Sequence, residues 1–144
     1  LTADSAGDKS GAEEVNPLIE QGKQAYFNQT DYDAAIGYFN QITTDSQYYV
    51  EAQYYLAHAQ LQNKNYTPAI QHFNFLLNQP ELPAFMNRSK IQWHQLLAKV
   101  GNGATLSDVE AELDQFIQDG EPPFNQKAVD LKAQLNSFWR SISF

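Results

Sequence analysis

One short phrase occurs twice in this chain, 34 positions apart, and it constrains the fold more than any other feature. The first copy is Tyr32-x-x-Ala35-Ile36-x-x-Phe39-Asn40, and the second is Tyr66-x-x-Ala69-Ile70-x-x-Phe73-Asn74. A repeat of this period is typical of arrays in which one supersecondary unit cannot bury its apolar face alone and must stack on the next. Because such arrays present an extended surface to other molecules, the repeat favours binding over catalysis.

Composition narrows the class of partner. The 144 residues suffice for one domain with a core, and an apolar content of 42% argues against a disordered chain. The formal net charge is −8 and the 9 basic residues are scattered along the chain, so neither nucleic acid nor an anionic membrane is an expected partner. There is no cysteine, and no apolar run approaches the roughly 18 residues that a spanning helix needs. We therefore expect no membrane insertion by this segment.

Apolar residues at helical spacing predict seven helices and no sheet. The expected ranges are 16–28, 31–42, 47–62, 66–78, 84–100, 107–118 and 124–139. Residues 1–15 are rich in Ser, Gly, Ala and Asp without an apolar period, which predicts a flexible linker or tail. The helical domain is then expected to occupy residues 16–144.

Three capping signals support these boundaries. Asp31 stands where an N-cap for the second helix is needed. Thr44-x-x-Gln47 and Ser107-x-x-Glu110 have the pattern of a capping box, in which two side chains satisfy the backbone N–H groups of a helix start. They predict the starts of the third and sixth helices.

The repeated phrase resembles the tetratricopeptide repeat (TPR), a helix–turn–helix of 34 residues. That family places small residues at its eighth and twentieth positions, where the two helices cross closely, and aromatic residues at the seventeenth and twenty-fourth. With Ala69 at the twentieth position, Ala57 falls at the eighth, Tyr66 at the seventeenth and Phe73 at the twenty-fourth. The segment 50–83 therefore matches closely.

The neighbouring repeats depart from the family pattern. In the first, Lys23 stands at the eighth position; either Gly22, one place earlier, supplies the close approach or the register shifts. In a third repeat with Trp93 at the fourth position, Leu97 and Val109 replace the small residues, so its hairpin should be splayed. This repeat starts 40 residues after the second, with six extra residues around 80–85. The resemblance implies an all-α fold: an α-solenoid of about three TPR-like hairpins plus a C-terminal capping helix.

The resemblance also implies which side chains face a partner, because the first helix of each TPR lines a concave groove. The expected partner-binding residues are Gln24, Phe27, Asn28, Glu51, Tyr54, His58, Leu61, Gln62, Ile91 and His94. Tyr54 has two interpretations: an exposed aromatic anchor, or a side chain that packs on the neighbouring helix. These residues contain no basic clamp for a carboxylate, so an acidic peptide tail is not the expected ligand.

His58 and His94 become neighbours across this groove. One interpretation is a metal pair, or an acid–base pair with Glu51; the other is two half-exposed rings of a binding surface. No HExxH motif, cysteine ligand, phosphate loop or nucleophile motif accompanies them. We therefore expect the protein not to be an enzyme, and we expect no cofactor and no metal.

These patterns leave two candidate functions. The first is a scaffold that binds a protein or peptide on the concave groove. The alternative is a self-associating module, such as a homodimer, whose groove is filled by its own or a neighbour's apolar tail, which carries Phe138, Trp139, Ile142 and Phe144. The stretch 48–57 also resembles TPR domains of bacterial envelope proteins. That resemblance implies an extracytoplasmic, periplasmic location with an N-terminal membrane anchor preceding residue 1; a cytoplasmic location is the alternative.

Overall fold

The structure, a computed structural model, describes residues 16–142, with side chains placed for 16–138. The predicted linker 1–15 lies outside the described residues. The elements are α2 (Pro17–Lys23), a π-helical turn η1 (Gln24–Asn28), α3 (Tyr32–Asn40), α4 (Tyr49–Gln62), α5 (Tyr66–Leu77), α6 (Arg88–Gly101), α7 (Leu106–Asp119) and α8 (Phe124–Ile142). Since η1 continues α2, the seven predicted helices are present. No strand occurs in the range 16–142, so the all-α prediction is confirmed for that range.

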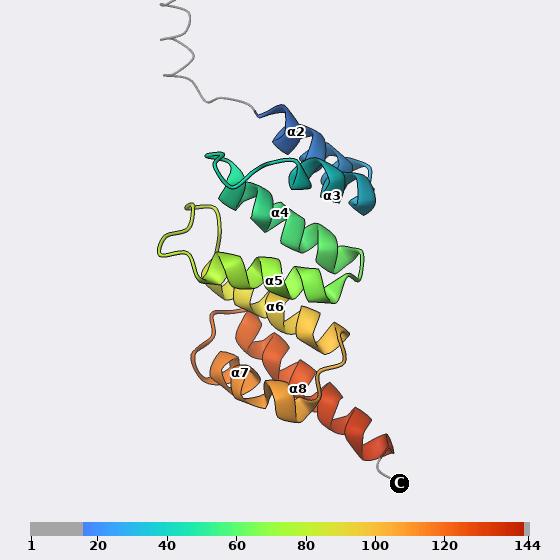
Figure 1. Cartoon of the computed structure of the whole chain (residues 1–144). Helices are drawn as coiled ribbons and strands as arrows, with labels where there is room; N and C mark the ends of the chain where they lie inside the picture. The colour runs from blue at the N-terminus through green and yellow to red at the C-terminus, as the bar shows by residue number, and fades with distance from the viewer. Residues whose placement is uncertain (1–15, 143–144) are drawn as a thin grey trace, which may run out of the picture.

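Helices that follow one another in sequence also lie beside one another in space. Figure 1 shows them stacked as a column from α2 to α8. Each of α2 to α5 packs extensively on the next helix, and α7 packs on α8, whereas α6 and α7 touch only sparsely. The large residues Leu97 and Val109 predict this opening of the α6–α7 hairpin.

The core consists of three clusters, and α4 and α6 each belong to two of them. α4 contributes Leu56 to the first cluster, around Phe39, and Ala57 to the second, around Phe73. α6 contributes Ile91 to the second cluster and Trp93 to the third. A helix buried on two sides loses its simple apolar stripe, because only one remaining side meets water. This explains why α4 buries seven of its 14 residues.

The first repeat has one residue more than the second between its small packing residues, and the π-turn η1 accommodates this extra residue. The small residues of the second repeat, Ala57 and Ala69, are 12 positions apart, but Gly22 and Ala35 are 13 apart. A π-turn adds one residue to a helix without interrupting it. Gly22 thereby reaches the helix crossing, where a Cβ would lie 2.5 Å from Cζ of Phe39. Both parts of the expectation hold: Gly22 supplies the close approach, and the register shifts at Gln24–Asn28.

The predicted caps have mixed outcomes. The Asp31 carboxylate accepts a hydrogen bond from the backbone N–H of Ala34 at 3.0 Å, which confirms that N-cap. The Thr44 box is wrong, because residues 44–48 form turns and α4 begins only at Tyr49, without a side-chain cap. The box predicted at Ser107 is two residues too late: Thr105 is the N-cap and Asp108 its reciprocal partner.

The start predicted for the fifth helix, residue 84, is also wrong. The helix begins at Arg88, after Asn87 caps it by accepting a hydrogen bond from the backbone N–H of Lys90 at 3.0 Å. Residues 78–87 instead form a loop between α5 and α6. We call this segment the 78–87 loop.

The crossing at Gly22 gives a direct test of the packing. Gly22→Ala should lower the free energy of unfolding by ~1–3 kcal/mol, because the added methyl group overlaps the buried Phe39 ring. Gly37→Ala is the matched control, since a Cβ there meets nothing within 4 Å and alanine is the better helix former. That control should gain roughly 0.5–1 kcal/mol. Urea denaturation measures both; equal effects at the two positions would show that the helices do not cross at Gly22.

Candidate functional site

An aromatic surface crosses the helices α2–η1, α4 and α6. We call it the aromatic face, and it consists of Phe27, Tyr54, Tyr55, His58, Phe85 and His94. Its rings contact one another in sequence from one helix to the next. It contains the four aromatic or imidazole side chains that the sequence assigned to the concave groove, together with two more, Tyr55 and Phe85.

The ring contacts connect all three helices. The centroid of Phe27 on η1 lies 6.0 Å from that of Tyr55 on α4, with the planes at 85°. Further along, the His58 centroid on α4 lies 4.8 Å from that of His94 on α6. Edge-to-face contacts at such distances are favourable, because the positive edge of one ring meets the negative face of the other. The predicted adjacency of His58 and His94 is confirmed.

Phe85, which sequence reasoning did not assign to the site, comes from the 78–87 loop. Its ring lies edge-on to Tyr54 at 5.7 Å and nearly parallel to Tyr55 at 6.5 Å. The adjacent Met86 is buried in the core, and Arg88 donates hydrogen bonds to the carbonyls of Leu77 and Gln79. These anchors fix the loop while Phe85 stays 55% exposed. The signal in the sequence was the six-residue excess around 80–85.

The predicted polar residues and Leu61 lie on the helices that carry the aromatic rings. Gln24 and Asn28 are exposed on η1, where the Asn28 amide donates a hydrogen bond to the Gln24 side chain. Gln62 is exposed at the end of α4, and Glu51 and Leu61 are half-buried on the same helix. Amide groups therefore accompany the rings on both η1 and α4.

The expectation that Ile91 lies outside the core is wrong. Its side chain is fully buried and packs in the second core cluster. The reason is the double burial of α6, whose side toward α5 takes up Ile91 while His94 lies on the α4 side. Each of the two interpretations of Tyr54 describes part of its environment. The side chain is half-buried and packs against the second cluster, and it also contacts Phe85 on the surface.

His58 is the most enclosed polar group of the aromatic face. Only 8% of its surface is exposed, between Tyr54, Phe73 and His94, and its Nε2 atom has no hydrogen-bond partner. The pKa of His58 is lowered to about 3, mainly by burial and to a smaller extent by the electrostatic effect of His94 and Lys90. His58 is therefore neutral at physiological pH.

His94 is neutral for the same main reason. Burial lowers its pKa, the hydrogen bond to the Lys90 carbonyl opposes that shift, and the charges of Lys90 and Lys127 add to it. The Nδ1 atom donates the proton in that bond, at 2.8 Å, since a carbonyl can only accept. The lone pair of neutral His94 therefore resides on Nε2.

The two ends of the aromatic face carry opposite charge. At the α6 end, Lys90 and Lys127 both act on His94, and neither ammonium group has an ion-pair partner among residues 16–138. At the α2–α4 end, burial raises the pKa of Tyr55 to about 12, and Glu51 and Glu20 contribute to that shift. The sequence places Lys90 and Lys127 37 positions apart, so their convergence could not be read from it.

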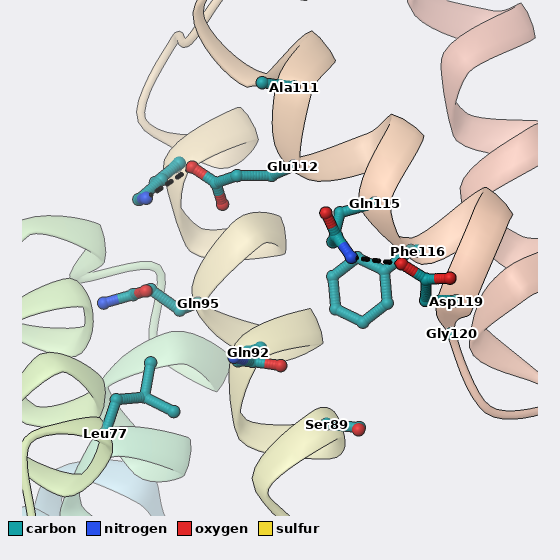
Figure 2. Close-up of a pocket in the computed structure, with 11 residues that line it drawn as sticks. Leu77, Ser89, Gln92, Gln95, Ala111, Glu112, Gln115, Phe116, Asp119 and Gly120 are labelled. Atoms are coloured by element: carbon teal, nitrogen blue, oxygen red, sulfur yellow. Dashed lines mark hydrogen bonds and ion pairs between the residues drawn. The ribbon is translucent and has the colours of Figure 1, made fainter.

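A separate cleft of about 600 Å³ opens between α6 and α7. Figure 2 shows Ser89 and Gln92 on α6 opposite Gln115 and Phe116 on α7. An ion pair between Lys99 Nζ and Glu112 Oε1, at 2.8 Å, bridges the two helices. The cleft follows from the splayed hairpin, and its lining combines the amides of Gln92, Gln95 and Gln115 with the charged side chains of Lys99, Glu112 and Asp119.

Comparison with protein-family models, with curated proteins and with solved structures finds no match. Within the part of the chain that the structure describes, no three His, Asp or Glu side chains form a group suited to a metal ion. In the same range no helix combines the length and apolar character needed to span a bilayer.

The buried imidazole predicts a specific loss of stability in acid. Because the pKa of His58 is lowered to about 3 from 6.5, the unfolded chain binds a proton between these pH values that the folded chain does not. The free energy of unfolding should therefore fall as pH decreases through this window, by about 2 kcal/mol between pH 7 and 5 from His58 alone. His58→Phe should remove that part of the slope in urea denaturation at pH 5 and 7.

The neighbouring groups define the control for this experiment. Protonation of His94 and the acid residues also contributes to the slope, so the comparison is between His58→Phe and His72→Phe. His72 lies on α5, is half-buried and is hydrogen-bonded to Gln53 at 2.7 Å. Burial lowers its pKa as well, without the charges that act on His58. Parallel pH profiles for wild type and His58→Phe would contradict the buried neutral state.

Proposed function

We propose that this protein is a TPR-like interaction module that binds a peptide or protein segment on the aromatic face. The observation that carries the proposal is the exposure of Phe27 and Phe85, at 57% and 55%, on either side of the half-buried Tyr55. Large exposed aromatic side chains that adjoin one another are typical of binding anchors, because they desolvate a large area at low entropic cost.

The repeat pattern supports the same proposal. The small residues Gly22 and Ala57, which the TPR pattern requires near the helix crossings, are both buried. In that architecture the first helices of successive hairpins share one surface, and here α2–η1, α4 and α6 carry the aromatic face. On the solenoid interpretation the six rings would line its groove.

Self-association remains the second candidate. Figure 1 shows the end of α8 at the opposite end of the column from α2, so a tail that filled the aromatic face would come from a neighbouring molecule. Phe138, at 55% exposure, belongs to the same end of α8. The periplasmic location proposed from the sequence stays a prediction.

Selection from a displayed library of random peptides tests the proposal. Wild-type protein should enrich a defined set of peptides, and Phe85→Ser should weaken their binding by about tenfold or more, because a central anchor contributes roughly 1–2 kcal/mol. Fluorescence anisotropy with the enriched peptides measures the change. Phe85 is a better probe than Tyr54, whose truncation would also remove packing against the core.

Phe138→Ser is the matched control, since Phe138 has the same exposure and lies on α8. It should leave peptide binding unchanged. If instead it abolishes binding while Phe85→Ser and Phe27→Ser do not, the aromatic face is not the site. Sedimentation velocity on the same variants would then show whether α8 mediates self-association.

A further inference from the structure

The aromatic face has the features of a surface for an extended chain. The strongly exposed apolar side chains on it are two separate rings, Phe27 and Phe85, with Tyr55 between them. An amphipathic helix lays a continuous apolar face on its partner, whereas polyproline II segments dock on surfaces lined by aromatic side chains. The rings meet edge to face, at 85° between Phe27 and Tyr55 and 87° between Tyr54 and Phe85, whereas Tyr55 and Phe85 lie nearly parallel at 17°.

Hydrogen-bonding groups accompany the rings. A polyproline II chain makes no internal hydrogen bonds, so its carbonyl groups need external donors. Because the pKa values of the Tyr54 and Tyr55 phenols are raised, mainly by burial, both hydroxyl groups keep their protons at physiological pH and can donate. The exposed amides of Gln24 and Asn28 supply further donors on η1.

The unpaired charged side chains at the two ends of the aromatic face have opposite signs. Near Tyr55, Lys23 pairs with Glu20 at 3.9 Å, which leaves Glu51 as the carboxylate without an ion-pair partner among residues 16–138. Near His94, Lys90 and Lys127 are the corresponding unpaired cations within that range. A complementary ligand therefore carries a basic residue at the α2–α4 end and an acidic residue at the α6 end.

From this arrangement we propose that the ligand of the aromatic face is a proline-rich, extended peptide with a basic residue at one end and an acidic residue at the other. The inference rests on the proposed function and adds the chemistry of the ligand. The aromatic face crosses two helix spacings, from α2–η1 through α4 to α6, which amount to roughly 16–20 Å, and a polyproline II chain that rises about 3.1 Å per residue covers it in about six residues. Glu51 on α4 and Lys90 on α6 are one spacing apart, so about three residues of the ligand separate its two charges.

The probes are synthetic, fluorescein-labelled peptides of roughly nine residues, with blocked termini. Each proline-rich peptide carries one Lys and one Asp about three residues apart, in both orders, because a polyproline II chain can dock in either direction. One comparison series replaces the prolines by alanine, and another carries two Lys or two Asp. Fluorescence anisotropy with the full chain should show the Lys/Asp proline peptides binding about tenfold more tightly than either series.

Charge variants identify the two ends. Lys90→Glu and Glu51→Lys should each weaken binding of the Lys/Asp peptides several-fold, and the double exchange should restore it, since the ligand can then dock in the reverse direction. Lys64→Glu is the matched control, because Lys64 is exposed in the turn between α4 and α5 and lies at the other end of α4 from Glu51. It should leave the affinity within about twofold.

The outcomes separate this inference from the proposed function. If library-selected peptides bind in a Phe85-dependent manner but the proline probes bind no better than their alanine versions, the ligand chemistry is wrong and the interaction module stands. Equal binding of the Lys/Asp, two-Lys and two-Asp peptides overturns the charge assignment and with it the inference. If neither selected nor proline peptides depend on Phe27 and Phe85, both proposals fail.

Discussion

The arrangement of this protein depends on the close approach of helices that are buried on two sides at once. α4 and α6 each belong to two core clusters. A large residue where one of these helices crosses a neighbour would therefore disturb the packing of both clusters. Gly22 lies under the Phe39 ring and Gly101 lies under the Tyr66 ring, where a Cβ would come within 2.5 Å of Cε1. Where Leu97 and Val109 stand at the corresponding positions, α6 and α7 separate and the cleft in Figure 2 opens. Packing at the crossings thus decides both the closed and the open parts of the column.

Double burial also explains why a partly exposed aromatic surface remains on one side of the column. α4 packs in one cluster with Leu56 and in the next with Ala57. The side of α4 that remains carries Tyr54, Tyr55 and His58. Tyr54 and Tyr55 are half-buried there, whereas His58 is covered between Tyr54, Phe73 and His94. The 78–87 loop covers part of this side with Phe85 and leaves the rest open. The aromatic face is therefore a consequence of the packing as well as a candidate for binding.

The sequence predicted what depends on local periodicity and spacing. The seven helices, the Asp31 cap and the contact between His58 and His94 follow from apolar period, cap chemistry and repeat register. The Thr44 box failed because its pattern is met equally by residues of a turn. Ile91 failed because register alone does not show that α6 is buried on the α5 side. Phe85 and the convergence of Lys90 and Lys127 depend on the path of a loop and on the placement of α8, which no local pattern encodes.

The two imidazoles of the aromatic face connect the stability of the fold to the character of the site. A neutral His58 with an unpaired Nε2 costs roughly 1–3 kcal/mol relative to an apolar ring of the same shape, yet it lies where the aromatic face joins α4 to α6. Its protonation would put a third positive charge beside Lys90 and Lys127 in a nearly closed environment. Because the folded chain keeps His58 neutral down to about pH 3, acidification from pH 7 to 5 destabilises the packing without adding this charge to the positive end of the surface. A ligand carboxylate held at that end would stabilise the protonated imidazole, so the loss of stability in acid should be smaller when an acidic residue is bound there.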